Sequence, residues 1–148
     1  MTIHEVKLRY QNPKPLSPDY FAIKSSLQCH QLLMSICDQD TIQVCETFYV
    51  IYLNQANRPI FYQSISTGGI TGTVVDVRLI AATALKTLAT SVIISHNHPS
   101  GSLKPSKSDL EVTKRISNAL KFFDINLLDH LIISPSSAYM SFADEGML

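Results

Sequence analysis

Short apolar runs and amphipathic segments alternate along this chain, and each kind of pattern predicts one kind of element. In residues 45–53 nearly every side chain is apolar or β-prone, which predicts a strand covered on both faces. Turn residues follow, and residues 59–65 are predicted to return as the second strand of a hairpin. By the same criteria we expect three more strands, at 91–95, 127–134 and 139–142.

Two further segments carry apolar residues at helical spacing. One face of a predicted helix in residues 77–88 holds Val77, Ile80, Ala81, Ala84, Leu85 and Leu88. A second amphipathic helix is predicted to begin near Ser106, with the apolar stripe Val112, Ile116, Ala119, Leu120 and Phe123. Ser25 and Ser26 are suited to cap a short helix before the first strand. This alternation of strands and helices, over the length of one domain, predicts a single α/β layered fold.

Composition and charge narrow the classes of protein that this pattern allows. Apolar residues make up 45% and charged residues 16% of the 148 residues, as in an ordinary globular domain. The 12 basic and 12 acidic residues balance, which gives no general attraction to a phosphate backbone. No apolar run approaches the roughly 20 residues of a membrane span, and the N-terminal residues lack a signal pattern. Three cysteines without C-x-x-C predict reduced, packed thiols, so we expect a cytoplasmic protein.

A histidine pair follows the strand predicted at residues 91–95. His96 and His98 are two residues apart, and in extended backbone such side chains point the same way, so both can reach one ion. Asp109 in the next helix is a candidate third ligand, and two imidazoles with one carboxylate suit Zn²⁺ and leave a fourth position open. Ser106 and Asp109 also fit a helix capping box. Spacing alone therefore leaves Asp109 between ligand and cap, and Ser106 between cap and active-site hydroxyl.

Glu46 is the candidate general base. It is a carboxylate at the start of an otherwise apolar run, where burial without a partner would cost free energy and raise its pKa. Beside a metal-bound water the carboxylate would have both a partner and a task. On the pattern alone, a solvent-exposed first residue of the strand is slightly favoured.

In combination these residues resemble a known superfamily. Glu46, the His96-x-His98 pair, Ser106 and Asp109 reproduce the E…H-x-H-P…S-x-x-D pattern of the JAB/MPN (JAMM) metalloproteases. Residues 96–101, 104–109, 128–133 and 141–146 make the chain similar to the RadC-like branch, a resemblance that covers residues 45–148. It implies a cytidine-deaminase-like mixed β-sheet flanked by helices at 41–148, preceded by an N-terminal extension at 1–40.

The resemblance also implies roles for individual side chains. One Zn²⁺ per chain would be held by His96, His98 and Asp109. Glu46 would be the acid/base that activates a metal-bound water and protonates the leaving amine, while Ser106 would steady that water or the developing oxyanion. The expected activity is zinc-dependent hydrolysis of an amide bond, of metallopeptidase or isopeptidase type, in a peptide or protein substrate.

Three further residues are candidate substrate contacts: Arg78, Asn97 and His130. Arg78 is equally suited to a solvated position at a helix start, and for His130 a structural or substrate-rim role is favoured over a catalytic one. Asp129 and His130 are neighbours in a predicted strand, so their side chains should point to opposite faces and not form a dyad.

Two features depart from the RadC-like pattern. Such proteins usually carry a helix-hairpin-helix-like segment before the catalytic fold, and the residues before Glu46 show no G-x-G hairpin for phosphate. Residues 73–78 differ from the His-Pro-Arg sequence of many relatives, although Arg78 keeps the arginine. The alternative function is a DNA-repair or mobile-element module with a structural or vestigial metal site. The neutral charge balance argues against strong DNA binding.

Overall fold

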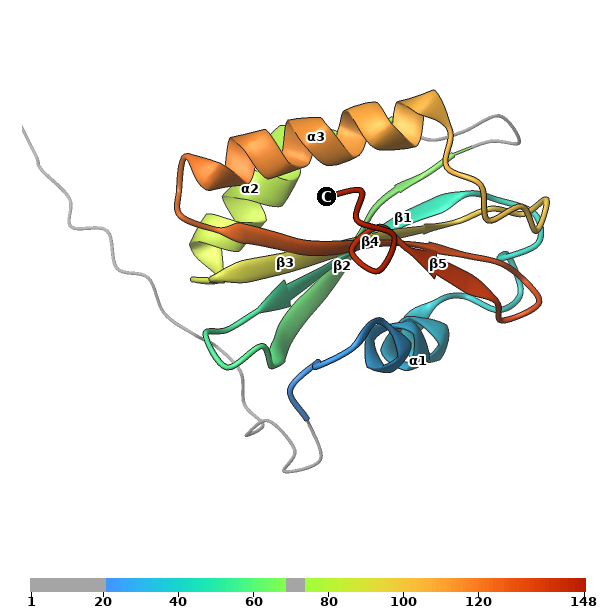
Figure 1. Cartoon of the computed structure of the whole chain (residues 1–148), viewed down its shortest axis with the longest axis horizontal. Coiled ribbons are helices and arrows are strands. Elements are labelled where there is room, and N and C mark those ends of the chain that lie inside the picture. The colour runs from blue at the N-terminus through green and yellow to red at the C-terminus, as the bar shows by residue number, and fades with distance from the viewer. Residues whose placement is uncertain (1–20, 69–73) are drawn as a thin grey trace, which may run out of the picture.

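A five-stranded mixed sheet forms the centre of the fold in the computed structural model, which describes residues 21–68 and 74–148 (Figure 1). The strands are β1 (Thr47–Leu53), β2 (Pro59–Thr67), β3 (Ser91–Asn97), β4 (Asn126–Ile133) and β5 (Tyr139–Ser141). They lie in the order β2-β1-β3-β4-β5. Only β3 and β4 pair in parallel, and the helix between them in the chain provides the crossover that parallel strands require.

Helices cover both faces of this sheet, as Figure 1 shows. On one face lie α2 (Val77–Lys86) and α3 (Lys107–Lys121), and on the other lies α1 (Ser26–Ile36). Successive residues of β3 enter different cores: Ile93 packs on the α1 side and Ile94 on the α2 and α3 side. The strands predicted from apolar runs are therefore buried on both faces, and the predicted α/β class with a mixed sheet flanked by helices is confirmed.

Side-chain caps fix where the helices begin. Ser25 accepts a hydrogen bond from the backbone N–H of Gln28 at the start of α1, as its position predicted. Asp76 caps α2 in the same way by accepting from the backbone N–H of Arg78. Ser106 caps α3, so the segment that carries Asp109 enters its helix at a defined place.

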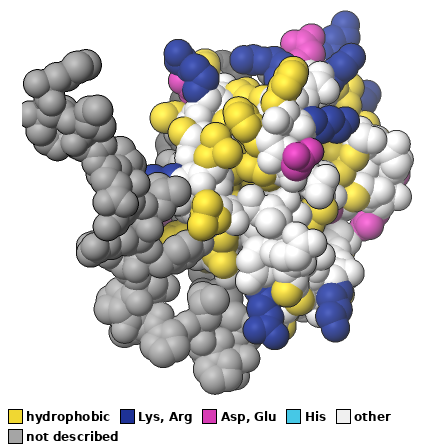
Figure 2. All heavy atoms as spheres, turned by 90° about the vertical axis from the view of Figure 1, so that its left-hand side faces the viewer, with side chains coloured by type: hydrophobic (Ala, Val, Ile, Leu, Met, Phe, Trp, Pro, Cys, Tyr) yellow, Lys and Arg dark blue, Asp and Glu magenta, His cyan; other side chains and the backbone are white. Residues whose placement is uncertain are grey.

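The predicted apolar stripes are wrong at their C-terminal ends. The second helix ends at Lys86, and Leu88 after it has a positive φ of 56° and is 60% exposed. Phe123 lies beyond the end of α3 and is also exposed. Figure 2 shows hydrophobic side chains at the surface, interspersed with Lys and Arg, on the side of the molecule that carries these helix ends. The buried part of each stripe is shorter and includes Ile80 in α2 and Ile116 in α3.

The first helix belongs to the core of the sheet. Cys29 and Leu33 from α1 and Ile42 after it lie in one hydrophobic cluster with residues of β1, β3 and β4. The boundary predicted after residue 40 falls between members of this cluster. Within residues 21–68 and 74–148, no helix has the length and hydropathy needed to cross a membrane.

Candidate metal centre

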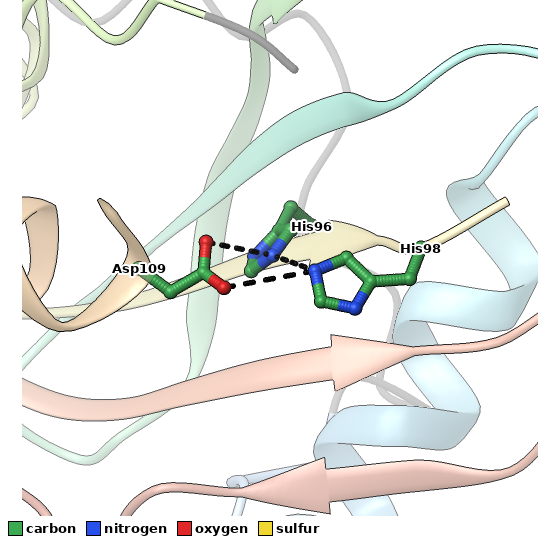
Figure 3. A group of neighbouring side chains, drawn as sticks. All are labelled: His96, His98 and Asp109. Atoms are coloured by element: carbon green, nitrogen blue, oxygen red, sulfur yellow. Dashed lines mark hydrogen bonds and ion pairs between the residues drawn. The ribbon is translucent and has the colours of Figure 1, made fainter. Parts of the chain in front are cut away.

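Three potential ligands converge where β3 ends (Figure 3). His96 is the penultimate residue of β3, and His98 directly follows the strand. Asp109 projects from the first turn of α3. The Nε2 atoms of His96 and His98 are 2.8 Å apart. Asp109 places Oδ1 3.2 Å from His96 Nε2 and Oδ2 3.7 Å from His98 Nε2. The predicted convergence of these three side chains is confirmed.

The loop after β3 holds His98 in place. Its backbone N–H bonds the carbonyl of Ile133 in β4, and its own carbonyl accepts from Gly101, whose φ of 79° favours glycine. The ring nitrogen Nδ1 lies 2.7 Å from the carbonyl oxygen of Ser102. Because a carbonyl only accepts, Nδ1 must carry the hydrogen, which leaves Nε2 of a neutral ring with a free lone pair directed at the cluster.

Asp109 acts as a helix cap and faces the histidines at the same time. Its Oδ2 accepts from the backbone N–H of Ser106 at 2.6 Å, and its own N–H donates to Ser106 Oγ at 3.1 Å, which completes the capping box. Burial raises the pKa of the Asp109 carboxyl, but the contacts with the His96 and His98 rings outweigh this effect and hold the pKa well below its usual range. The two roles that the sequence left open are therefore compatible.

The donor set fits a divalent cation. The carboxylate of Asp109 only accepts, and His98 offers a bare nitrogen to the same point. Ligands at the usual zinc distances lie about 3.3 Å apart in a tetrahedral site, and the three separations here fall on both sides of that value. The hydrogen bond to Asp109, opposed by burial, raises the pKa of His98, so the cluster attracts positive charge. His96, His98 and Asp109 are thus suited to hold a metal ion, and their set of two imidazoles and one carboxylate is one that zinc accepts.

The cluster opens into a cavity of about 540 Å³. Glu46 and Ser106 line this cavity together with the three ligand side chains. Glu46 is half-buried, directly before β1, and its backbone carbonyl accepts from the N–H of Gly68 after β2. Ser106 is exposed and uses its hydroxyl to cap α3. Both residues predicted to be catalytic therefore share one cavity with the three candidate ligands.

Two of the candidate substrate contacts are buried in the structure. Asn97 is 1% exposed, and its amide bonds the backbone N–H of Thr47 and the carbonyls of Ile42 and Cys45. It therefore holds the segment that carries Glu46. His130 has no exposed surface and lies behind His96, so a substrate in the cavity cannot reach it.

The structure also places Arg78, the third candidate substrate contact, and the neighbours Asp129 and His130. Arg78 is exposed and ion-paired with Asp76 at 2.7 Å, and it does not line the cavity, which fits the solvated helix position. Asp129 accepts from the backbone N–H of His130 and from the hydroxyl of Ser141, so its carboxylate does not pair with the imidazole. This confirms that the two neighbours form no dyad.

Sequence reasoning missed two residues around the site. Thr113 is buried in α3 and contacts His130, although the predicted stripe contains only apolar positions. The signal was its place one turn after Asp109 on the covered face of the helix. Arg115 lies outside the predicted apolar stripe of its helix, yet its side chain lines the cavity.

Comparison with known proteins places this site in a family. A family model described as the RadC-like JAB domain matches residues 23–147. A UPF0758 protein of Flavobacterium johnsoniae is 48% identical over 102 residues, which are 69% of this chain and 44% of that protein. The UPF0758 protein YfjY of Escherichia coli is 42% identical over 103 residues, which are 70% of this chain and 64% of that protein. The chain thus spans about half the length of the curated relatives it matches. The match includes α1, in agreement with its place in the core, and this chain belongs to the RadC-like JAB domain family.

Proposed function

We propose that this chain is a zinc-dependent hydrolase of amide bonds, of metallopeptidase or isopeptidase type. The observation that carries the proposal is the convergence of His96, His98 and Asp109 at a cavity that also contains the Glu46 carboxylate. Membership of the JAB domain family supports a hydrolase of the JAMM type. Metal-assisted hydrolysis requires a group of metal ligands and, beside it, a carboxylate that is not itself a ligand; Glu46 would be that carboxylate.

In this proposal each side chain has a separate task. His96, His98 and Asp109 hold the metal, which when bound supplies a Lewis acid and lowers the pKa of water in the site. Glu46 accepts a proton from the attacking water and later donates it to the leaving nitrogen. Ser106 offers a hydroxyl at the cavity wall, where it can orient water or stabilise negative charge on the substrate oxygen. Asn97 keeps Glu46 in place through the backbone on either side of it.

The shape and lining of the cavity favour a polypeptide substrate. Its volume of about 540 Å³ is in the range that binds small molecules or a few peptide side chains. Apolar side chains of Phe48, Val75 and Val112 lie beside the charged Glu111 and Arg115. Such a mixed wall suits an amide backbone flanked by apolar and charged side chains better than a purely apolar or purely anionic ligand.

A pair of variants tests the proposed mechanism. Glu46→Gln removes the proton acceptor and leaves the three ligands intact, so we expect parental zinc content and a loss of about 10²–10⁴-fold in hydrolysis. Glu111→Gln is the matched control for removal of a carboxylate, because Glu111 lines the same cavity from α3 and takes no part in the proposed proton transfer. Cleavage would be measured on libraries of linear and isopeptide-linked peptides. A Glu46→Gln variant that cleaves as fast as its parent would contradict the mechanism.

A further inference from the structure

His130 is a buried histidine with no role in the mechanism above. It has no exposed surface, and its ring stacks on Phe142 at a centroid distance of 4.5 Å and lies 5.9 Å from the ring of Phe48. Both ring nitrogens have partners in this apolar setting. Nε2 is 2.8 Å from Nδ1 of His96, and Nδ1 is 2.6 Å from Oγ1 of Thr113. His130 therefore connects a metal ligand to a residue of α3.

Thr113 determines the direction of the hydrogen bonds in this connection. Its Oγ1 is also 2.5 Å from the backbone carbonyl oxygen of Asp109, and two oxygens at that distance repel unless a hydrogen lies between them. The carbonyl cannot donate, so the single hydroxyl hydrogen of Thr113 points to Asp109. Thr113 then accepts from Nδ1–H of His130.

The same logic continues to the metal cluster. A neutral His130 with its hydrogen on Nδ1 has a bare Nε2, which must accept from Nδ1–H of His96. A neutral His96 with its hydrogen on Nδ1 has a bare Nε2, and this is the atom that lies 3.2 Å from Asp109 Oδ1. The chain of bonds thus leaves a lone pair on the nitrogen that faces the cluster. This Nε2 is also 2.8 Å from Nε2 of His98, and lone pairs that converge so closely repel one another unless a cation or a proton lies between them.

We propose that Thr113 and His130 form a positioning relay that fixes the ring tautomer of His96 and presents its Nε2 lone pair to the metal. In metal sites a ligating histidine is usually oriented by a carboxylate or a carbonyl that accepts a hydrogen bond from its second ring nitrogen. Here the group that accepts this hydrogen bond is a second imidazole. The relay also ties the first turn of α3, which carries Asp109, to β3 and β4. The inference rests on the metal site of the proposed function.

The relay can be tested without metal. In metal-free protein labelled with ¹⁵N-histidine, long-range ¹H–¹⁵N spectra at about pH 8, where ordinary histidines are neutral, report which ring nitrogen carries the hydrogen. The relay predicts hydrogen on Nδ1 of both His96 and His130 in the parent. In Thr113→Val we expect His96 to shift towards the Nε2–H tautomer, and in Thr113→Ser, which keeps the hydroxyl, we expect the parental pattern.

A second readout is zinc affinity, measured by competition with a chromophoric chelator. We expect Thr113→Val to bind zinc about 10–100-fold more weakly and Thr113→Ser to bind as the parent does. A His96 ring without hydrogen on Nδ1 in the parent, or an unchanged His96 tautomer in folded Thr113→Val, would overturn the relay. If Thr113→Val does not fold, the parental spectrum alone decides. A parent with the predicted tautomers that binds no zinc would contradict the proposed function and not the relay.

Discussion

Replacement of Asn97 by alanine would remove three hydrogen bonds of one side chain, of which two are buried and one is part-buried. Oδ1 accepts from the backbone N–H of Thr47 at 2.8 Å, and Nδ2 donates at 2.8 Å to the carbonyls of both Ile42 and Cys45. These bonds fasten residues 42–47 to the end of β3 between the two histidine ligands. The substitution therefore affects both the stability of the fold and the position of Glu46.

The expected loss follows from the backbone groups that Asn97→Ala leaves behind. A buried group that loses its partner costs about 1–3 kcal/mol, so three such groups cost roughly 3–9 kcal/mol. The Cys45 carbonyl is only part-buried and a water molecule can enter the vacated space, so we expect the lower part of that range, about 3–5 kcal/mol. This loss is a large share of the free energy of unfolding of an ordinary domain, which is roughly 5–15 kcal/mol.

Ser95 provides a matched control on the same strand. It is two residues away on the same face of β3 and is 1% exposed, but among the described residues its hydroxyl has no hydrogen-bond partner. Ser95→Ala should therefore leave the free energy of unfolding unchanged or raise it slightly. Urea unfolding would be followed by circular dichroism, since the chain has no tryptophan. Equal unfolding midpoints for Asn97→Ala and Ser95→Ala would refute the assignment of these three bonds.

Three further predictions concern the core, the helix cap and the thiols. Leu120→Ala, at a fully buried position of α3, should lower the free energy of unfolding by about 2–5 kcal/mol in urea titrations. Ser106→Ala should cost about 1 kcal/mol through loss of the cap and also weaken zinc binding, because the capping box orients Asp109; a variant with unchanged zinc affinity would contradict this coupling. Burial, with a smaller effect of Asp129, raises the pKa of Cys29 from 9.0 to about 12. Since the unfolded chain loses this proton first, stability in pH-dependent melts should fall as the pH rises from 9 towards 12.

Much of the fold follows from the sequence because its strands are buried on both faces. The apolar run at β1 and the run at β3 could be recognised without knowledge of their partners, and β3 proved only two residues longer than predicted. The ends of the helices were less predictable. Leu85 and Leu88 continue the helical spacing, but whether an apolar side chain is covered depends on where the sheet ends.

The candidate site shows the same division. The spacing of His96 and His98 was enough to predict that their side chains lie together, because residues i and i+2 of an extended segment point to the same side. Spacing could not decide between ligand and cap for Asp109, since one carboxylate with two oxygens can serve both roles. His130 lies 34 residues from His96 in the chain, and only the parallel pairing of β3 with β4 places their rings in contact.

The central claim is that His96, His98 and Asp109 hold one zinc ion, and metal analysis of purified protein tests it most directly. The parent and His96→Ala would be loaded with zinc, freed of excess metal and analysed by mass spectrometry, with circular dichroism to confirm the fold. The account predicts one equivalent of bound zinc in the parent and its loss in His96→Ala. A parent without bound zinc, or a folded His96→Ala that retains a full equivalent, would contradict it.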